Sequence, residues 1–185
     1  MQYIDAKAKR TVQKRLFSKI TKCKTFLGLA GPHPEEYRKI LPQANNYVLV
    51  DFNAVDESIY QNSLIGAFDT LRYHQHCYTM LNVVDCDFCK SIKSDGIDLL
   101  YIYTKMKRSN VRNQYITFTF SLRGIGLEAT LDWLNDNFNL NIENRTFNKI
   151  EGDFGYKKFI HKLYNQDIYM YRDSGDYMIR GLLKI

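Results

Sequence analysis

The chain has 185 residues, of which 45% are hydrophobic, 14% aromatic and 25% charged. This composition is that of one folded domain and excludes an intrinsically disordered chain. No run approaches the roughly 18 consecutive apolar residues of a membrane span, and the charged N-terminus lacks the apolar run of a signal peptide. Four cysteines are too few for a disulfide framework. We therefore expect a cytoplasmic protein without a membrane partner.

The net charge of +6 is concentrated near the N-terminus. Residues 1–24 hold eight lysines and arginines against one acid, a local charge of +7, so the other 161 residues sum to −1. Apolar residues recur every fourth position from Val12 to Ile20, which predicts a basic amphipathic helix over about 5–20. Localised positive charge is typical of contact with phosphate, so Lys14, Arg15 and Lys19 are candidate nucleic-acid-binding residues. A solvated helix face is the alternative.

The first half of the chain alternates short apolar runs with helical patterns. A run over 25–30 closes in Gly31-Pro32-His33-Pro34, which is typical of a buried strand entering a turn. Proline followed by two acids then favours a helix start. The predicted elements are a strand over 25–30, a helix over 34–41, a strand over 47–51, a helix over 57–73 and a strand over 78–85.

The second half continues this alternation and ends in a hairpin. Residues 98–107 favour a helix, although 99–104 fit a strand equally well. The further predicted elements are a strand over 114–121, helices over 127–137 and 156–164, and strands over 168–171 and 177–185. Asp173-Ser-Gly-Asp176 separates the last two strands and suits a hairpin loop.

Strands that alternate with helices predict a parallel sheet with helical crossovers. The fold class is therefore α/β: a Rossmann-like, mostly parallel sheet with flanking helices and a C-terminal antiparallel β-hairpin at or near the sheet edge. We expect residues 1–23 to form the basic N-terminal helix and residues 24–185 to form a single domain.

Two strand ends carry a resemblance to a known family. The first strand ends in Gly28-Leu-Ala30-Gly31-Pro32 and the second ends in Asp51. With the order of elements over 24–185, this resembles the class I S-adenosylmethionine (SAM)-dependent methyltransferases, in their small viral and phage branch. The resemblance implies SAM as cofactor, with the backbone at Gly28, Ala30, Gly31 and Pro32 near its methionine part and Asp51 accepting the ribose hydroxyls.

The turn departs from the family pattern, which places an acid early and then Gly-x-Gly. Here Gly28 takes the place of the acid, Ala30 takes that of the first glycine, and prolines follow. The departure fits either a variant of the turn or a chain that has lost the cofactor.

Asp85-Cys-Asp-Phe-Cys89 follows the third predicted strand, where amino-methyltransferases carry an Asn or Asp, two prolines and an aromatic residue. The resemblance implies that Asp85 or Asp87 holds a target amine and that Phe88 stacks on the base, although this chain lacks the prolines. A capped loop with a buried phenylalanine is the alternative. Arg123, after the strand over 114–121, could contact phosphate or pair with Asp85 or Asp87.

The same region contains potential metal ligands. His74, His76 and Cys77 precede Cys86 and Cys89, and Cys-x-x-Cys is a zinc-ligand spacing. The spacing of the first three is unusual for zinc, and cysteines at a strand exit are often small buried residues, so no metal site is predicted.

The resemblance favours a SAM-dependent methyltransferase that acts on DNA or RNA. The alternative is a non-catalytic methyltransferase-like binding protein, such as a phage or mobile-element inhibitor or a subunit of a larger complex with a protein partner.

Overall fold

The computed structural model describes residues 7–29, 35–51, 59, 61–73, 81–152, 158–173 and 175–185. Its helices are α1 (Lys7–Phe17), α2 (Glu35–Ile40), α3 (Leu64–Tyr73), α4 (Ile92–Lys107) and α5 (Leu127–Phe138). Its strands are β1 (Thr25–Leu29), β2 (Asn46–Val50), β3 (Leu81–Ser91), β4 (Tyr115–Ser121), β5 (Phe147–Gly152), β6 (Lys158–Leu163), β7 (Ile168–Asp173) and β8 (Tyr177–Lys184).

The strands form one eight-stranded sheet in the order β2-β1-β3-β4-β8-β7-β6-β5. Strands β2, β1, β3 and β4 run parallel to one another. Strand β8 pairs antiparallel with β4, and every later pairing is also antiparallel. The fold is thus mixed α/β. The prediction of a mostly parallel sheet holds only for the first half, because a second hairpin, β5–β6, extends the antiparallel half.

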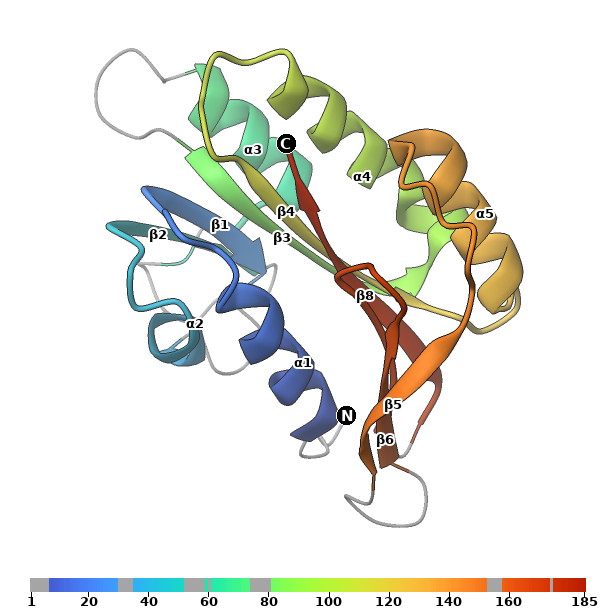
Figure 1. Ribbon diagram of the computed structural model, residues 1–185. Helices are drawn as coiled ribbons and strands as arrows, with labels where there is room; N and C mark the ends of the chain where they lie inside the picture. Colours follow the sequence, from blue (N-terminus) through green and yellow to red (C-terminus); the bar gives the residue numbers. More distant parts are fainter. Residues whose placement is uncertain are drawn as a thin grey trace.

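Helices cover both faces of the sheet (Figure 1). Helices α1 and α2 lie on one face, and α3, α4 and α5 lie on the other. Within α1, Ala8, Val12, Leu16 and Phe17 are fully buried against the sheet. The apolar stripe read from the sequence is therefore the docking face of α1, and this helix shares a core with β6, β7 and β8.

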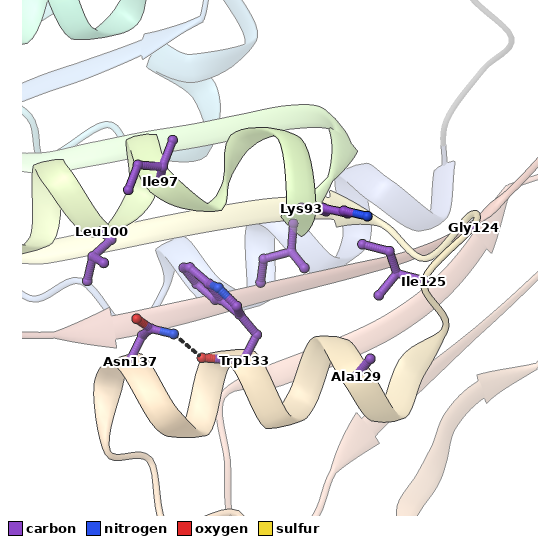
Figure 2. A pocket seen from close by; sticks show the side chains of 9 residues that line it. Lys93, Ile97, Leu100, Gly124, Ile125, Ala129, Trp133 and Asn137 are labelled. Carbon is purple, nitrogen blue, oxygen red and sulfur yellow. Dashed lines mark hydrogen bonds between the residues drawn. The ribbon is translucent and has the colours of Figure 1, made fainter.

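On the opposite face, α4 and α5 lie side by side with Trp133 between them (Figure 2). A Cβ atom added to Gly96 of α4 would lie 2.9 Å from Cζ2 of Trp133, closer than van der Waals contact allows. Glycine at this position therefore lets the indole ring pack directly on the α4 backbone.

Most predicted elements are confirmed within a few residues, including the strands over 25–30, 47–51 and 114–121, the helix over 127–137 and the terminal hairpin. Residues 99–104 are helical, within α4. The helix predicted over 57–73 is described only in part, and its described portion starts at Leu64.

Three predictions are wrong. Residues 158–163 form β6 rather than a helix, because pairing with both β5 and β7 outweighs the near-helical spacing of their apolar residues. The third strand continues to Ser91 instead of ending at Asp85. The terminal hairpin lies inside the sheet, since β8 is flanked by β4 and β7, and β5 forms the edge.

None of the described helices combines the length and apolarity needed to cross a bilayer.

Candidate functional site

The carboxyl ends of β1 and β2 lie next to each other. Leu29, the last residue of β1, is the register partner of Val50, the last residue of β2. Asp51 therefore leaves β2 beside the point where the chain leaves β1, and its side chain is half-buried. Ala30, Gly31 and Pro32 lie outside the described residues.

Gly28 lies within β1, one residue before its end, with Leu49 and Asp85 as register partners. A Cβ atom added there would lie 2.7 Å from two ring carbons of Phe26. The role of Gly28 visible in the structure is thus close packing, because it leaves room for the Phe26 ring beneath α1.

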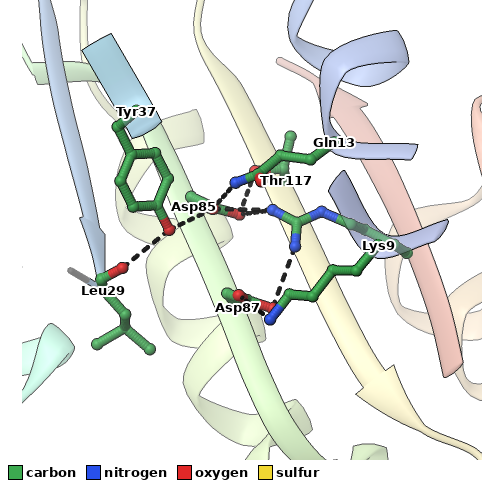
Figure 3. Close-up of polar contacts among 8 residues, drawn as sticks. Lys9, Gln13, Leu29, Tyr37, Asp85, Asp87 and Thr117 are labelled. Atoms are coloured by element: carbon green, nitrogen blue, oxygen red, sulfur yellow. Dashed lines mark hydrogen bonds and ion pairs between the residues drawn. The ribbon is translucent and has the colours of Figure 1, made fainter. Parts of the chain in front are cut away.

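A buried ionic cluster lies on the α1 face of β3 (Figure 3). Arg180 of β8 reaches across the sheet to Asp85, with Nη2 2.6 Å from Oδ1 and 2.8 Å from Oδ2. Its Nη1 donates to Oδ1 of Asp87 at 3.1 Å. The side chains of Arg180 and Asp85 are fully buried, and that of Asp87 is 11% exposed.

Residues from three other elements, α1, α2 and β4, complete this cluster. Lys9 Nζ lies 2.6 Å from Oδ2 of Asp87, and Thr117 Oγ1 donates to Oδ1 of Asp85 at 2.6 Å. Gln13 Nε2 lies 3.5 Å from Oδ2 of Asp85. The Tyr37 hydroxyl lies 2.8 Å from the carbonyl oxygen of Leu29 and 3.1 Å from Oδ2 of Asp85. We call Lys9, Gln13, Tyr37, Asp85, Asp87, Thr117 and Arg180 the Asp85 network.

The formal charges of the Asp85 network sum to zero, since two carboxylates face one guanidinium and one ammonium group. Burial raises the pKa of Asp85, and the Arg180 charge opposes that rise. Burial also acts to raise the pKa of Asp87, but Lys9 and Arg180 together lower it to about 2. The pKa of Tyr37 is raised by burial and then by Asp85. Asp87 is therefore ionised and the Tyr37 hydroxyl is neutral at neutral pH.

The three residues predicted to hold a target do not lie together. Asp85 and Asp87 sit inside β3 and point toward α1. Phe88 lies on the other face, in the core beneath α4, with its ring centroid 5.8 Å from that of Phe120. Alternation along the strand causes this separation, because neighbouring residues of a strand face opposite sides.

Arg123 does not pair with Asp85 or Asp87. It is exposed after β4 and its nearest acid is Asp176 at 3.7 Å. Arg180 pairs with both acids instead, although it was not among the predicted site residues. The signal was present, because an arginine stands between Ile179 and Gly181 in an otherwise apolar strand, and a buried arginine needs a paired acid.

Three basic residues of the N-terminal segment form ion pairs with acids of the fold. Lys9 binds Asp87, Arg10 lies 3.1 Å from Glu36, and Lys19 pairs with Asp167. Lys14 is exposed and Arg15 is half-buried. Part of the predicted phosphate-facing charge is thus used within the fold, where it holds α1 and the following turn in place.

The described residues contain no cluster of metal-ligating side chains. Cys86 is fully buried in the core. His74, His76 and Cys77 lie outside the described residues, as does the side chain of Cys89.

Comparison with known proteins identifies related folds but no sequence family. No family model matches the chain, and no curated protein matches it. A candidate SAM-dependent methyltransferase from Streptococcus mutans matches with a TM-score of 0.56 and 12% identity. A candidate methyltransferase solved in complex with SAH matches with a TM-score of 0.58 and 13% identity. Each match covers 96% of this chain and 49% of the other, so the chain spans about half the length of the structures it matches. The chain has the fold of these methyltransferase-like structures.

Proposed function

We propose that this chain is a SAM-dependent methyltransferase that binds SAM at the carboxyl ends of β1 and β2 and acts on nucleic acid. The observation that carries the proposal is the sheet itself. Four parallel strands in the order β2-β1-β3-β4 are followed by antiparallel β8, in a fold that resembles the structure solved with SAH. Ligands of open α/β sheets bind at the carboxyl ends of their strands.

The residues at these strand ends suit the cofactor. Asp51 offers a half-buried carboxylate beside the end of β1, and a carboxylate can accept hydrogen bonds from both ribose hydroxyls. When bound, SAM supplies an electrophilic methyl group. The task left to this chain is to hold the cofactor and align the acceptor atom with it.

Of the two acids first considered for the target, we assign the contact to Asp87. Both acids are bonded to Arg180, but the side chain of Asp87 keeps some exposure and stays ionised, whereas that of Asp85 is fully buried. In this proposal Asp85 and Arg180 fix the position of Asp87, and Phe88 supports the strand from the core.

One observation favours the second candidate function, a methyltransferase-like binding protein without catalysis. Both acids are already bonded to Arg180, and Asp87 is also bonded to Lys9. Such a protein would bind a partner without transferring a methyl group.

Calorimetric titration with SAM tests the cofactor site. We expect the chain to bind SAM and the Asp51→Ala variant to bind about tenfold to a hundredfold more weakly, because hydrogen bonds to a carboxylate are lost. Asp136→Ala, which changes an exposed acid on α5, is the matched control and should bind as the parent chain does. Absence of SAM binding in the parent chain would contradict the proposal. It would favour the second function, as would SAM binding without methyl transfer to DNA or RNA.

Fluorescence anisotropy with labelled DNA and RNA tests the nucleic-acid target. The double variant Lys14→Gln, Lys22→Gln removes two exposed cations near α1, and we expect weaker binding and a shallower dependence on salt. Each lost phosphate contact should lower the slope of log K against log salt by roughly 0.7 to 0.9. Lys105→Gln, Lys107→Gln on α4 is the control. Equal effects of both double variants would argue against recognition through α1.

A further inference from the structure

An apolar groove runs between α4 and α5, on the face of the sheet opposite the Asp85 network (Figure 2). Its volume is about 690 Å³, and its apolar lining residues are Ile92, Ile97, Leu100, Ile125, Ala129 and Trp133. The proposed cofactor and target residues take no part in it, so its role is independent of the proposed function.

The groove has a projecting side chain on its rim. Ile97 of α4 is 68% exposed, more than any other of the exposed large hydrophobic side chains among the described residues. Figure 2 shows Lys93 and Ile97 on α4, with the Trp133 ring between the two helices. The same surface therefore offers both an apolar projection and an apolar hollow, and a self-complementary interface requires both.

The charges on the two helices are complementary. The exposed charged residues of α4 are all basic: Lys93, Lys105 and Lys107. Those of α5 are all acidic: Glu128, Asp132 and Asp136. Arg145 pairs with two of these acids, Glu128 and Asp132, yet their side chains stay 69% and 57% exposed. Helix α4 also carries two half-buried acids, Asp95 and Asp98. Its exposed lysines beside the exposed acids of α5 can still pair with a second copy turned by a two-fold rotation.

We propose that the α4–α5 groove is the interface of a homodimer, in which α4 of each copy enters the groove of the other. A two-fold axis along the groove places Ile97 of one copy over Trp133 of the other. The same rotation places Lys93 of one copy beside the start of α5, near Glu128 of the other. Apolar burial at the centre and paired charges at the rim are the usual anatomy of a protein interface.

Sedimentation equilibrium of the 185-residue chain tests the dimer. We expect a concentration-dependent monomer–dimer equilibrium, and a monomer at all concentrations up to about 200 μM would overturn the proposal. Ile97→Lys should raise the dimer dissociation constant by about tenfold or more, because a central apolar anchor is lost. Ile150→Lys changes a 44% exposed isoleucine on β5 and should leave the dissociation constant unchanged. Equal dissociation constants for the two variants would also overturn it.

A charge exchange tests the two-fold arrangement. Lys93→Glu and Glu128→Lys should each weaken self-association, since like charges then meet at both rims of the dimer. An equimolar mixture of the two variants should form a heterodimer with near-parental affinity, because every contact again joins opposite charges. Failure of the mixture to associate, with both variants shown to be folded by circular dichroism, would overturn the arrangement.

Discussion

Replacing Arg180 with methionine is expected to lower the free energy of unfolding by about 3 to 5 kcal/mol. The substitution keeps most of the side-chain volume but removes the cation that bonds both Asp85 and Asp87. Two carboxylates would then remain in the core with only Lys9 as a cationic partner. Urea denaturation monitored by circular dichroism measures the loss.

Two further variants test whether the loss comes from unpaired charge. Arg172→Met removes a cation from the neighbouring strand β7. Cζ of Arg172 lies 4.7 Å from the Tyr177 ring centroid, and its loss should lower the free energy of unfolding by less than about 1 kcal/mol. The triple variant Asp85→Asn, Asp87→Asn, Arg180→Met removes both carboxylates and the guanidinium group together, leaves only the partly exposed Lys9 charged, and should recover much of the lost stability. If the triple variant were as unstable as Arg180→Met, packing rather than charge would explain the effect.

Replacing Gly181 with alanine is expected to destabilise the protein by about 1 to 3 kcal/mol. Alanine normally stabilises a strand relative to glycine, so the expected sign is reversed here. The cause is Phe118, the cross-strand partner of Gly181, whose ring covers the glycine so closely that an added Cβ would overlap it. Ile168 crowds the added Cβ atom as well, since its Cγ1 would lie 3.1 Å from that atom.

A double-mutant cycle isolates this contact. In a Phe118→Leu background the ring is gone, so Gly181→Ala should become neutral or stabilising, with a coupling free energy of about 1 kcal/mol or more. Leu182→Val, at the next position of β8 on the opposite face, should show no such coupling. Additive effects of Gly181→Ala and Phe118→Leu would contradict the steric explanation.

The local sequence pattern was sufficient to predict the elements whose own residues favour one type of secondary structure. The run over 114–121 alternates threonine with isoleucine and phenylalanine and is rich in β-branched and aromatic residues, so it predicts a strand in any context. The segment over 158–163 has no such clear pattern. Its state depends on two neighbouring strands, and the sequence shows neither their register nor their direction.

The candidate site was predictable only in part, for a similar reason. The place of Asp51 at the end of the second strand could be predicted because it depends on a local pattern, and its role in binding SAM stays a prediction. The link between Asp85 and Arg180 joins residues 95 positions apart and depends on β8 lying beside β4. The terminal hairpin was predicted at or near the sheet edge, and that prediction gave no reason to bring Arg180 near Asp85.

The central position of β8 also bears on how the chain folds. Its pairing with β4 joins residues between 57 and 69 positions apart, from Ser121 with Met178 to Tyr115 with Lys184. Closing so long a loop costs conformational entropy before the contacts between β4 and β8 can form. This cost slows folding. We therefore expect β1 to β4 and their helices to collapse first, leaving the edge of β4 unpaired. Until β8 arrives, that edge can pair with strands of other chains, so the slowest step of folding is also the one most exposed to aggregation.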